Sequence, residues 1–498
     1  MSEESIRNKT VKGVGWTAAE SVAKYAVSFV VGIILARLLS PDDYGLIGLI
    51  TIFIVIADSL IDSGFSSALI KKKDATDDDY NTVFIINLSM SVLLYVVLFL
   101  SAHAIAHFFE RQELVSLIRV ISVNIILGAL CIVQRVQLTK SLDFKKQTKL
   151  SLIASVVSGI LGIMFALLGF GVWALVISSI SGTAIRTFLF WFYNRWWPSF
   201  YFAVQSFREL FGFGWKLLVS GLINTVWNEI YQVVIGKFYA PATLGQYSRA
   251  TGFSNLFSTN LTSIVQRVSY PALSQIQDDR ERLKNGYRSI IKTTMLVTFS
   301  CMLMLASVAK PMILSLIGEK WLQAASFLQI VCFSSMLYPL HAINLNMLQV
   351  QGRSDLFLKL EIIKKVIAVL PIMLGIFINI YWMLIGSVFV GIISYYLNAY
   401  YSGPFLNYSI STQIKDIMPS FTIALGCATV VYALSFIPCN HVIVFSIQLI
   451  VGVALLIIVY EKVKLPEYIE VKHIALSYMS NTKKLKKYKK TKNEYRSN

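Results

Sequence analysis

Residues 151–193 read SLIASVVSGILGIMFALLGFGVWALVISSISGTAIRTFLFWFY, and Arg186 is their only charged residue. The segment GFG (169–171) divides them into two apolar runs of about 20 residues, the length that a helix needs to cross a bilayer core of about 30 Å. A water-soluble fold could not hide so continuous an apolar surface. The stretch therefore predicts two membrane-spanning helices joined by a short turn.

The same pattern extends over the whole chain of 498 residues, of which 56% are hydrophobic and 14% are charged. Soluble domains carry about 25% charged residues, and the mean hydropathy of this chain is +0.64. We therefore predict an all-α polytopic membrane protein with about 14 transmembrane helices. The predicted spans are 14–39, 43–70, 80–107, 114–139, 149–169, 171–193, 212–238, 243–272, 286–309, 322–348, 355–379, 381–402, 416–437 and 441–460.

Basic residues gather in the loops on one side of this arrangement, at 7–12, 71–73, 140–149 and 280–288. The loops of the other side hold Arg111, Lys237, Lys310 and Lys320. Because Lys and Arg favour cytoplasmic loops, both termini are predicted to be cytoplasmic. The net charge of +18 is dispersed over short loops, which favours anionic lipid headgroups over nucleic acid as a partner.

A repeat divides the chain into two lobes. GVGW (13–16) recurs as GFGW (212–215), and SPDDYG (40–45) is matched by APATLG (240–245). The offset of about 200 residues spans an even number of predicted helices, so the lobes are related by an axis along the membrane normal. We expect a six-helix lobe at 1–193, a cytoplasmic interfacial linker at 194–211, a second six-helix lobe at 212–402, two extra transmembrane helices at 403–460 and a basic cytoplasmic tail at 461–498.

Charged residues deep inside a span are candidates for function, because each costs about 2.5 kcal/mol or more at the bilayer centre. Lys24 lies near the midplane of the first span, one turn from Glu20. Asp58 and Asp62 share one face of the second span. Two interpretations of this cluster remain open: an ion pair that staples the two helices, or a hydrated cavity that binds an anionic substrate and a coupling ion.

Glu229 forms a second polar stripe, with Asn224 and Asn228, on the seventh span. The other charges within the spans lie about two turns or less from a predicted helix end, where long side chains reach the headgroups. They are Arg119, Arg135, Arg186, Arg249, Arg267 and Lys292. For these residues an interfacial position is the simpler expectation.

The sequence lacks motifs for catalysis, cofactors and metals. HAIAH (103–107) spaces two histidines by four residues but lacks the glutamate of a zinc motif, and no nucleotide-binding glycine loop is present. The five cysteines have no paired spacing. We therefore expect no enzyme activity, no cofactor and no metal, and transport driven by an ion gradient, the membrane potential or consumption of the product.

Several segments together resemble the Wzx-type polysaccharide flippases, particularly the colanic-acid-exporter branch. These belong to the MOP (multidrug/oligosaccharidyl-lipid/polysaccharide) exporter superfamily, which also holds the MATE exporters and the lipid II flippase. The resemblance covers residues 5–470. The segments that carry it are GWTAAES (15–21), LARLLSPDDYGL (35–46), DSGFSSALIKK (62–72), YPALSQIQDDRERLKNGYRSIIK (270–292), GEKWLQAASFLQI (318–330) and QGRSDLFLKLEIIKK (351–365).

The resemblance implies a two-lobed bundle with a central cationic cavity. It also implies that the protein moves undecaprenyl-diphosphate-linked oligosaccharide repeat units across the bacterial cytoplasmic (inner) membrane for a surface polysaccharide, which is a capsule, an O-antigen or an exopolysaccharide. The implied partners are this lipid-linked substrate, the membrane lipids, and the polysaccharide polymerase and glycosyltransferases of the pathway.

On this interpretation, basic side chains in the cavity replace part of the hydration of the diphosphate. Lys24 is the first candidate for substrate binding, and Arg249 and Arg267 of the eighth span are the next. Asp58, Asp62 and Glu229 are the candidates for ion coupling.

Two other functions stay open at this point. A MATE-like ion-coupled antiporter of small molecules has the same fold class and could use the same carboxylates. An intramembrane glycan polymerase or ligase would need reactive groups at the outer face, where only His103, His107, Glu110 and Arg111 cluster.

Overall fold

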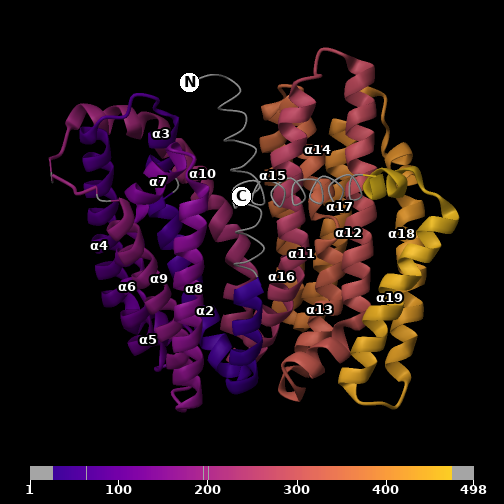
Figure 1. Cartoon of the computed structure of the whole chain (residues 1–498), viewed down its shortest axis with the longest axis horizontal. Helices are drawn as coiled ribbons and strands as arrows, with labels where there is room; N and C mark the ends of the chain where they lie inside the picture. The colour runs from indigo at the N-terminus through magenta and orange to yellow at the C-terminus, as the bar shows by residue number, and fades with distance from the viewer. Residues whose placement is uncertain (1–25, 63, 195, 200, 474–498) are drawn as a thin grey trace, which may run out of the picture. The chain divides into compact units, whose positions relative to one another are not determined.

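The computed structural model describes residues 26–473 apart from residues 63, 195 and 200. Within these residues the chain consists of helices and connecting turns, and it contains no strand (Figure 1). The all-α polytopic class predicted from the sequence is confirmed. The chain divides into two compact units, one of residues 1–248 with 316–321 and one of residues 249–315 with 322–498.

The first unit consists of helices joined by turns. The quoted stretch folds as expected into two of them, because the turn between them places Gly169 and Gly171 at positive φ, where glycine is unstrained. The unit contains a helix at 26–38, α2 (Pro41–Asp62), α3 (Phe65–Lys71), α4 (Asp77–Phe108), α5 (Leu114–Ile121), α6 (Val123–Ala129), α7 (Ile132–Lys140), α8 (Phe144–Leu167), α9 (Val172–Asn194), α10 (Val204–Phe238) and the first turns of α11 (Pro241–Ser274).

Two predicted spans of the first unit are interrupted. The second span divides into α2 and α3 near Gly64, and the fourth divides into α5, α6 and α7. At Gly64 a neighbouring backbone leaves no room for a side chain, since a Cβ there would lie 2.6 Å from the carbonyl oxygen of Gly214 in α10. The interruptions position α3, α6 and α7 around one space inside the first unit.

The two copies of the repeat motif meet in the first unit. Pro41 begins α2 and Pro241 begins α11, each at the first helical position that proline favours. A Cβ on Gly45 would lie 1.9 Å from the carbonyl oxygen of Pro241, and one on Gly245 would lie 1.9 Å from that of Pro41. Each glycine therefore allows the backbone of the other copy to approach, which explains why the motif ends in glycine in both halves.

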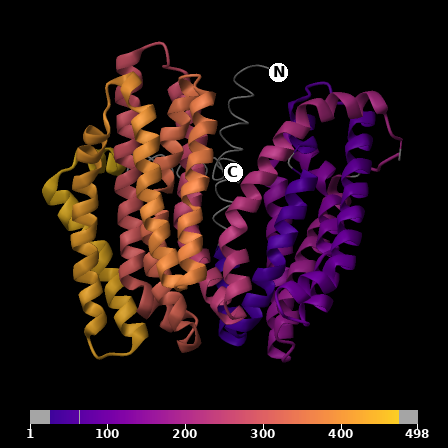
Figure 2. The ribbon, with the colours of Figure 1, turned by 180° about the vertical axis from the view of Figure 1, so that it is seen from behind.

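The second unit is a bundle of long helices, coloured from rose through orange to yellow in Figure 2. Its last two helices lie side by side in both views and pack against each other. The unit contains the rest of α11, then α12 (Arg280–Leu316, to Ser315), α13 (Leu322–Ser335), α14 (Tyr338–Val350), α15 (Ser354–Ile367), α16 (Val369–Phe377), α17 (Ile380–Ser402), α18 (Ile410–Ala433) and α19 (His441–Val463).

Ten helical runs in the described part of the chain are long and apolar enough to cross a membrane. α10, α11 and the pair α15–α16 fall outside this set, and of the first predicted span the structure describes residues 26–39, with a helix at Ala26–Leu38. The number fourteen therefore stays a prediction. So do the predicted domain boundaries, although the two compact units divide within α11, between Ser248 and Arg249.

Candidate functional site

A cavity of about 620 Å³ lies within the first unit. This volume falls in the range of small-molecule and cofactor pockets. One wall comes from α2 and α3, another from α6 and α7, and α9 and α10 contribute single residues. Its polar lining consists of Asp58, Ser59, Ser66, Ser67, Arg135, Thr139, Arg186 and Thr225.

Two arginines and one carboxylate line this cavity. Arg135 comes from α7 and Arg186 from α9. Arg186 makes no ion pair or hydrogen bond with any residue that the structure describes. It lies eight residues before the end of α9, about 12 Å along the helix axis. Among the described residues the lining therefore holds one more positive than negative group, and its arginines offer planar donors suited to phosphate.

Among the predicted site residues whose side chains the structure describes, Asp58 alone lines the cavity. Its neighbour Ser59 lies 3.2 Å, oxygen to oxygen, from the hydroxyl of Thr225 in α10. Glu229 lies one turn beyond Thr225 on α10, where it accepts a hydrogen bond from Gln232, and it does not line the cavity.

The remaining predicted site residues lie elsewhere. Arg249 is half-buried and Arg267 is exposed, both on the part of α11 that belongs to the second unit, and neither lines the cavity. Lys24 and its neighbour Glu20 lie outside the described residues. Asp62 ends α2, and its side chain also lies outside the described part of the chain.

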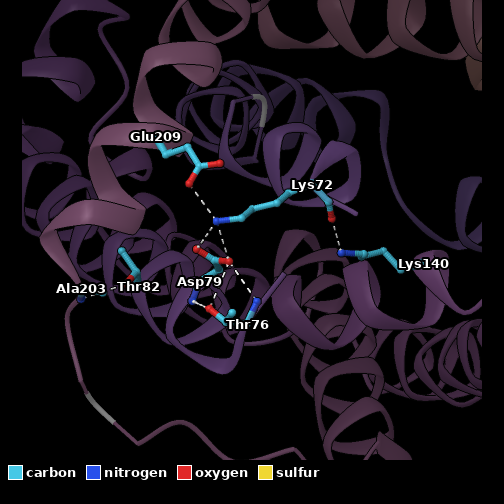
Figure 3. Close-up of polar contacts among 7 residues, drawn as sticks. All are labelled: Lys72, Thr76, Asp79, Thr82, Lys140, Ala203 and Glu209. Carbon is cyan, nitrogen blue, oxygen red and sulfur yellow. Dashed lines mark hydrogen bonds and ion pairs between the residues drawn. The ribbon is translucent and has the colours of Figure 1, made fainter. Parts of the chain in front are cut away.

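A cluster around Lys72 anchors two helices of the cavity wall (Figure 3). Lys72 follows α3, and its Nζ lies 3.0 Å from a carboxylate oxygen of Asp79 and 2.9 Å from one of Glu209 in α10. The Nζ of Lys140, the last residue of α7, donates to the carbonyl oxygen of Lys72 at 2.6 Å. Thr76 caps α4 by accepting from the amide of Asp79, whose carboxylate accepts from the amide of Thr76. The cluster thus joins the ends of α3, α4, α7 and α10.

The electrostatics of the Lys72 cluster are asymmetric. Asp79 is fully buried, whereas Glu209 is more than half exposed. The hydrogen bond to Glu209 raises the pKa of Lys72, and partial burial opposes it less strongly. Lys72 is therefore charged at physiological pH and neutralises a buried carboxylate that would otherwise be unpaired.

The segment GEKW (318–321) belongs to the first unit, although α12 and α13 on either side of it belong to the second. The indole of Trp321 donates to the carbonyl oxygen of Ala36 at 2.8 Å, and Lys320 donates to that of Arg37 at 2.7 Å. These two carbonyl groups belong to the last turn of the helix at 26–38, where no backbone amide of the same helix is available to donate to them. Trp321 is fully buried and packs edge-on against Tyr44 in α2.

The sequence favoured an interfacial position for Arg135 and Arg186 and did not single them out as site residues, whereas the structure shows that both line the cavity. One signal for Arg186 was available, because it is the only charge in 151–193. For Arg135 no comparable signal existed, because the division of the fourth predicted span into α5, α6 and α7 does not show in its apolar pattern.

Comparison with known proteins gives a family and a fold. Residues 34–326 match the family described as polysaccharide biosynthesis protein. The teichuronic acid biosynthesis protein TuaB of Bacillus subtilis (strain 168) is 28% identical over 71% of this chain and 73% of its own length. The lipopolysaccharide biosynthesis protein WzxC of Escherichia coli (strain K12) is 24% identical over 87% of this chain and 89% of its own.

Among solved structures, the lipid II flippase MurJ in its inward closed conformation matches with a TM-score of 0.69. The match covers 90% of this chain and 100% of MurJ, at 17% sequence identity. At that identity the likeness shows the fold alone, which is that of a polytopic helical membrane transporter.

Proposed function

Because this chain belongs to the polysaccharide biosynthesis protein family, we propose that it translocates lipid-linked oligosaccharide repeat units across the bacterial cytoplasmic membrane for a surface polysaccharide. The cavity lined by Arg135 and Arg186 carries the proposal. An undecaprenyl-diphosphate carrier presents two adjacent phosphates, and guanidinium groups bind phosphate with two parallel hydrogen bonds. The names of the relatives, which refer to teichuronic acid and lipopolysaccharide biosynthesis, support a polysaccharide precursor as the substrate.

In this proposal the diphosphate and its first sugars enter the cavity while the polyprenyl chain stays in lipid. Arg135 and Arg186 hold the diphosphate, and the hydroxyls of Ser66, Ser67 and Thr139 hydrogen-bond the sugar. Asp58 limits the net positive charge, so that the product can leave as well as bind. Lys24, Arg249 and Arg267 remain proposed substrate ligands for other stages of transport, and Asp58, Asp62 and Glu229 remain proposed coupling groups.

We place both termini in the cytoplasm. The sequence supports this placement, since the basic loops at 71–73, 140–149 and 280–288 fall on one side. The Lys72 cluster then lies at the cytoplasmic end of the first unit, and GEKW (318–321) lies at the outer end. The polysaccharide polymerase and glycosyltransferases would act on either side of the transport step.

A strain that lacks its own oligosaccharide-lipid flippase tests the function. The full chain should restore surface polysaccharide, measured by gel electrophoresis and staining. The variant with Arg135→Gln and Arg186→Gln should reach the membrane in equal amount and restore about a tenth or less, because each lost charge-assisted contact is worth about 1.5–3 kcal/mol. Arg208→Gln is the matched control, because Arg208 is exposed on α10 and does not line the cavity. Full restoration by the double variant would contradict the proposed site.

The MATE-like alternative is disfavoured by the same cavity. A pocket for cationic small molecules needs an excess of carboxylates, whereas the described lining has two arginines against Asp58. Export of a lipophilic cation by the full chain, unaffected by Arg186→Gln, would reverse this preference.

A further inference from the structure

After α19 the chain enters a short helix, which the structure describes at 466–473 and which is drawn in yellow just before the grey trace in Figure 1. Lys464 lies between the two helices. Its φ of +54° is in the left-handed region, and its amide donates to the carbonyl oxygen of Tyr460. A left-handed residue of this kind ends a helix and redirects the chain. The short helix therefore does not continue the axis of α19.

One face of the short helix is fixed to α12 and α18. The carboxylate of Glu467 is buried, lies 3.0 Å from the Nζ of Lys292 in α12 and accepts from the hydroxyl of Ser420 in α18 at 3.3 Å. One turn further, Glu470 accepts from the hydroxyl of Thr293 in α12 at 3.2 Å. Residues three apart lie on the same face of a helix. Two carboxylates therefore hold this face, and the opposite face is presented in a fixed position.

The opposite face lines a pocket of about 220 Å³ within the second unit. The rings of Tyr460 and Tyr468 stack at 5.5 Å between centroids, and the hydroxyl of Tyr468 donates to Glu461 at 3.0 Å. These contacts join the short helix to the end of α19. The lining consists of Tyr460, Glu461 and Lys464 from the end of α19 and its cap, and of Tyr468, Ile469, Lys472 and His473 from the short helix.

The pocket carries an excess of positive charge. Lys472 forms an ion pair with Glu461, and this hydrogen bond raises the pKa of the lysine, which is therefore charged at neutral pH. The ammonium group of Lys464 is exposed and makes no ion pair or hydrogen bond with any residue that the structure describes. With His473 neutral, the described lining holds one more positive than negative group. A single phosphodiester would balance this charge.

The surroundings of the pocket are apolar. Ile457, Ile458 and Val463 in the last turns of α19 are each roughly half exposed, and so is Ile469 at the pocket. Because α19 is long and apolar enough to cross a membrane, acyl chains are the expected neighbours of these side chains. Tyrosine is enriched where a span meets the headgroups, and lysine in the loops beyond. A ligand with both a phosphate and acyl chains therefore matches both parts of the site.

We propose that this pocket binds the phosphate of an anionic glycerophospholipid. Lys464 and Lys472 hold the phosphate oxygens, and an acyl chain lies along Ile458 of α19. Pockets for small molecules measure about 300–1,000 Å³, so this smaller one takes a headgroup phosphate and not a diphosphate with its sugars. Glu461 also disfavours the second negative charge of a diphosphate. The site is thus distinct from the cavity of the first unit, and only its assignment to the inner leaflet rests on the proposed cytoplasmic position of the termini.

Native mass spectrometry of the full chain in detergent tests the site. The probe is dioleoyl phosphatidylglycerol, and dioleoyl phosphatidylcholine has the same chains without net charge. We expect the first phosphatidylglycerol to bind about tenfold or more tightly than phosphatidylcholine, and Lys464→Gln with Lys472→Gln to remove most of this preference. Lys464→Gln alone should weaken binding about fivefold. Since this side chain is exposed and has no partner among the described residues, the single variant is expected to fold normally and decides the question if the double variant does not.

Lys359→Gln with Lys415→Gln is the matched control, because both lysines are exposed in the second unit and neither lines the pocket. It removes the same charge and should leave the affinity unchanged. A wild-type affinity for phosphatidylglycerol in Lys464→Gln, or equal affinities of the wild type for the two lipids, would overturn the proposal. Displacement of phosphatidylglycerol by inorganic phosphate would show that the pocket takes a soluble anion and would overturn the lipid. None of these readouts depends on transport, so a failure of the flippase function would leave them unchanged.

Discussion

Two arginines of the first unit line an open cavity, whereas Arg288 and Lys292 of the second unit are held in ion pairs with carboxylates. In the first unit, Arg186 has no partner among the described residues and faces about 620 Å³ of space. In the second unit, Arg288 holds Asp416 with two hydrogen bonds, and Lys292 lies 3.0 Å from the buried carboxylate of Glu467. The two sets of charges therefore differ in what they face: the ion pairs of the second unit hold helices together, whereas the arginines of the first unit face a space that our proposal assigns to a ligand.

Charge reversal in the cavity should give the largest effect. In Arg135→Glu with Arg186→Glu, three carboxylates line the cavity, so a diphosphate meets repulsion where it met two cations. We expect transport of an undecaprenyl-diphosphate oligosaccharide in proteoliposomes to fall roughly a hundredfold or more, since a lost charged hydrogen bond costs about 1.5–3 kcal/mol. The melting temperature of the detergent-solubilised protein should stay close to that of the wild type. A large drop in melting temperature would show that Arg135 and Arg186 stabilise the fold, which would contradict the contrast between the two units.

Neutralising Asp416 should show the opposite pattern. Asp416→Asn replaces the carboxylate that joins α18 to Arg288 of α12 with a neutral amide, which keeps one acceptor oxygen but cannot accept both hydrogen bonds from Arg288. Removing one partner from a buried ion pair costs about 3–5 kcal/mol, and the partial exposure of Arg288 places the expected loss near the lower value. The melting temperature should fall by several degrees, as scanning fluorimetry would show. Asp355→Asn is the control, because its ion pair with Arg353 is exposed on both sides.

Much of the fold could be predicted from the sequence, because hydrocarbon-length runs and prolines at helix starts are local signals. The paired helices α8 and α9 and the helix starts at Pro41 and Pro241 follow from such signals. The cavity could not be predicted in the same way. A helix that is apolar on nearly all sides gives no period to show which face turns inward, so the lone charge of Arg186 marks α9 as unusual but does not show that this residue faces a cavity.

Substitution of a repeat glycine should have an intermediate effect on stability, and it tests whether the two copies of the motif must stay in contact. Gly245→Ala places a methyl group 1.9 Å from the carbonyl oxygen of Pro41, a contact that backbone atoms must move to relieve. Overpacking of this kind costs about 1–3 kcal/mol. Gly252→Ala on the same helix has nothing within 4 Å of the new methyl group and should be neutral or slightly stabilising. Equal melting temperatures for the two variants would show that the copies separate readily.

The smallest effect is expected at Glu209, the exposed partner of Lys72. Glu209→Gln removes a surface ion pair and should lower the free energy of unfolding by about 1 kcal/mol or less. Lys72 keeps its bond to the buried Asp79 in this variant, so α3 and α7 stay anchored beside the cavity.

In the wild type the pKa of Lys72 is raised by Glu209, so its stabilising charge is fully present below the ordinary lysine pKa and is lost only as the pH rises through the raised value. Thermal scans from about pH 6 to about pH 9 stay below the ordinary lysine pKa of about 10.4. They should therefore show a constant difference in melting temperature between the wild type and the variant. A difference that shrinks within this range would mean that Lys72 loses its proton near neutrality, and the asymmetric cluster would then no longer account for the anchoring of the cavity wall.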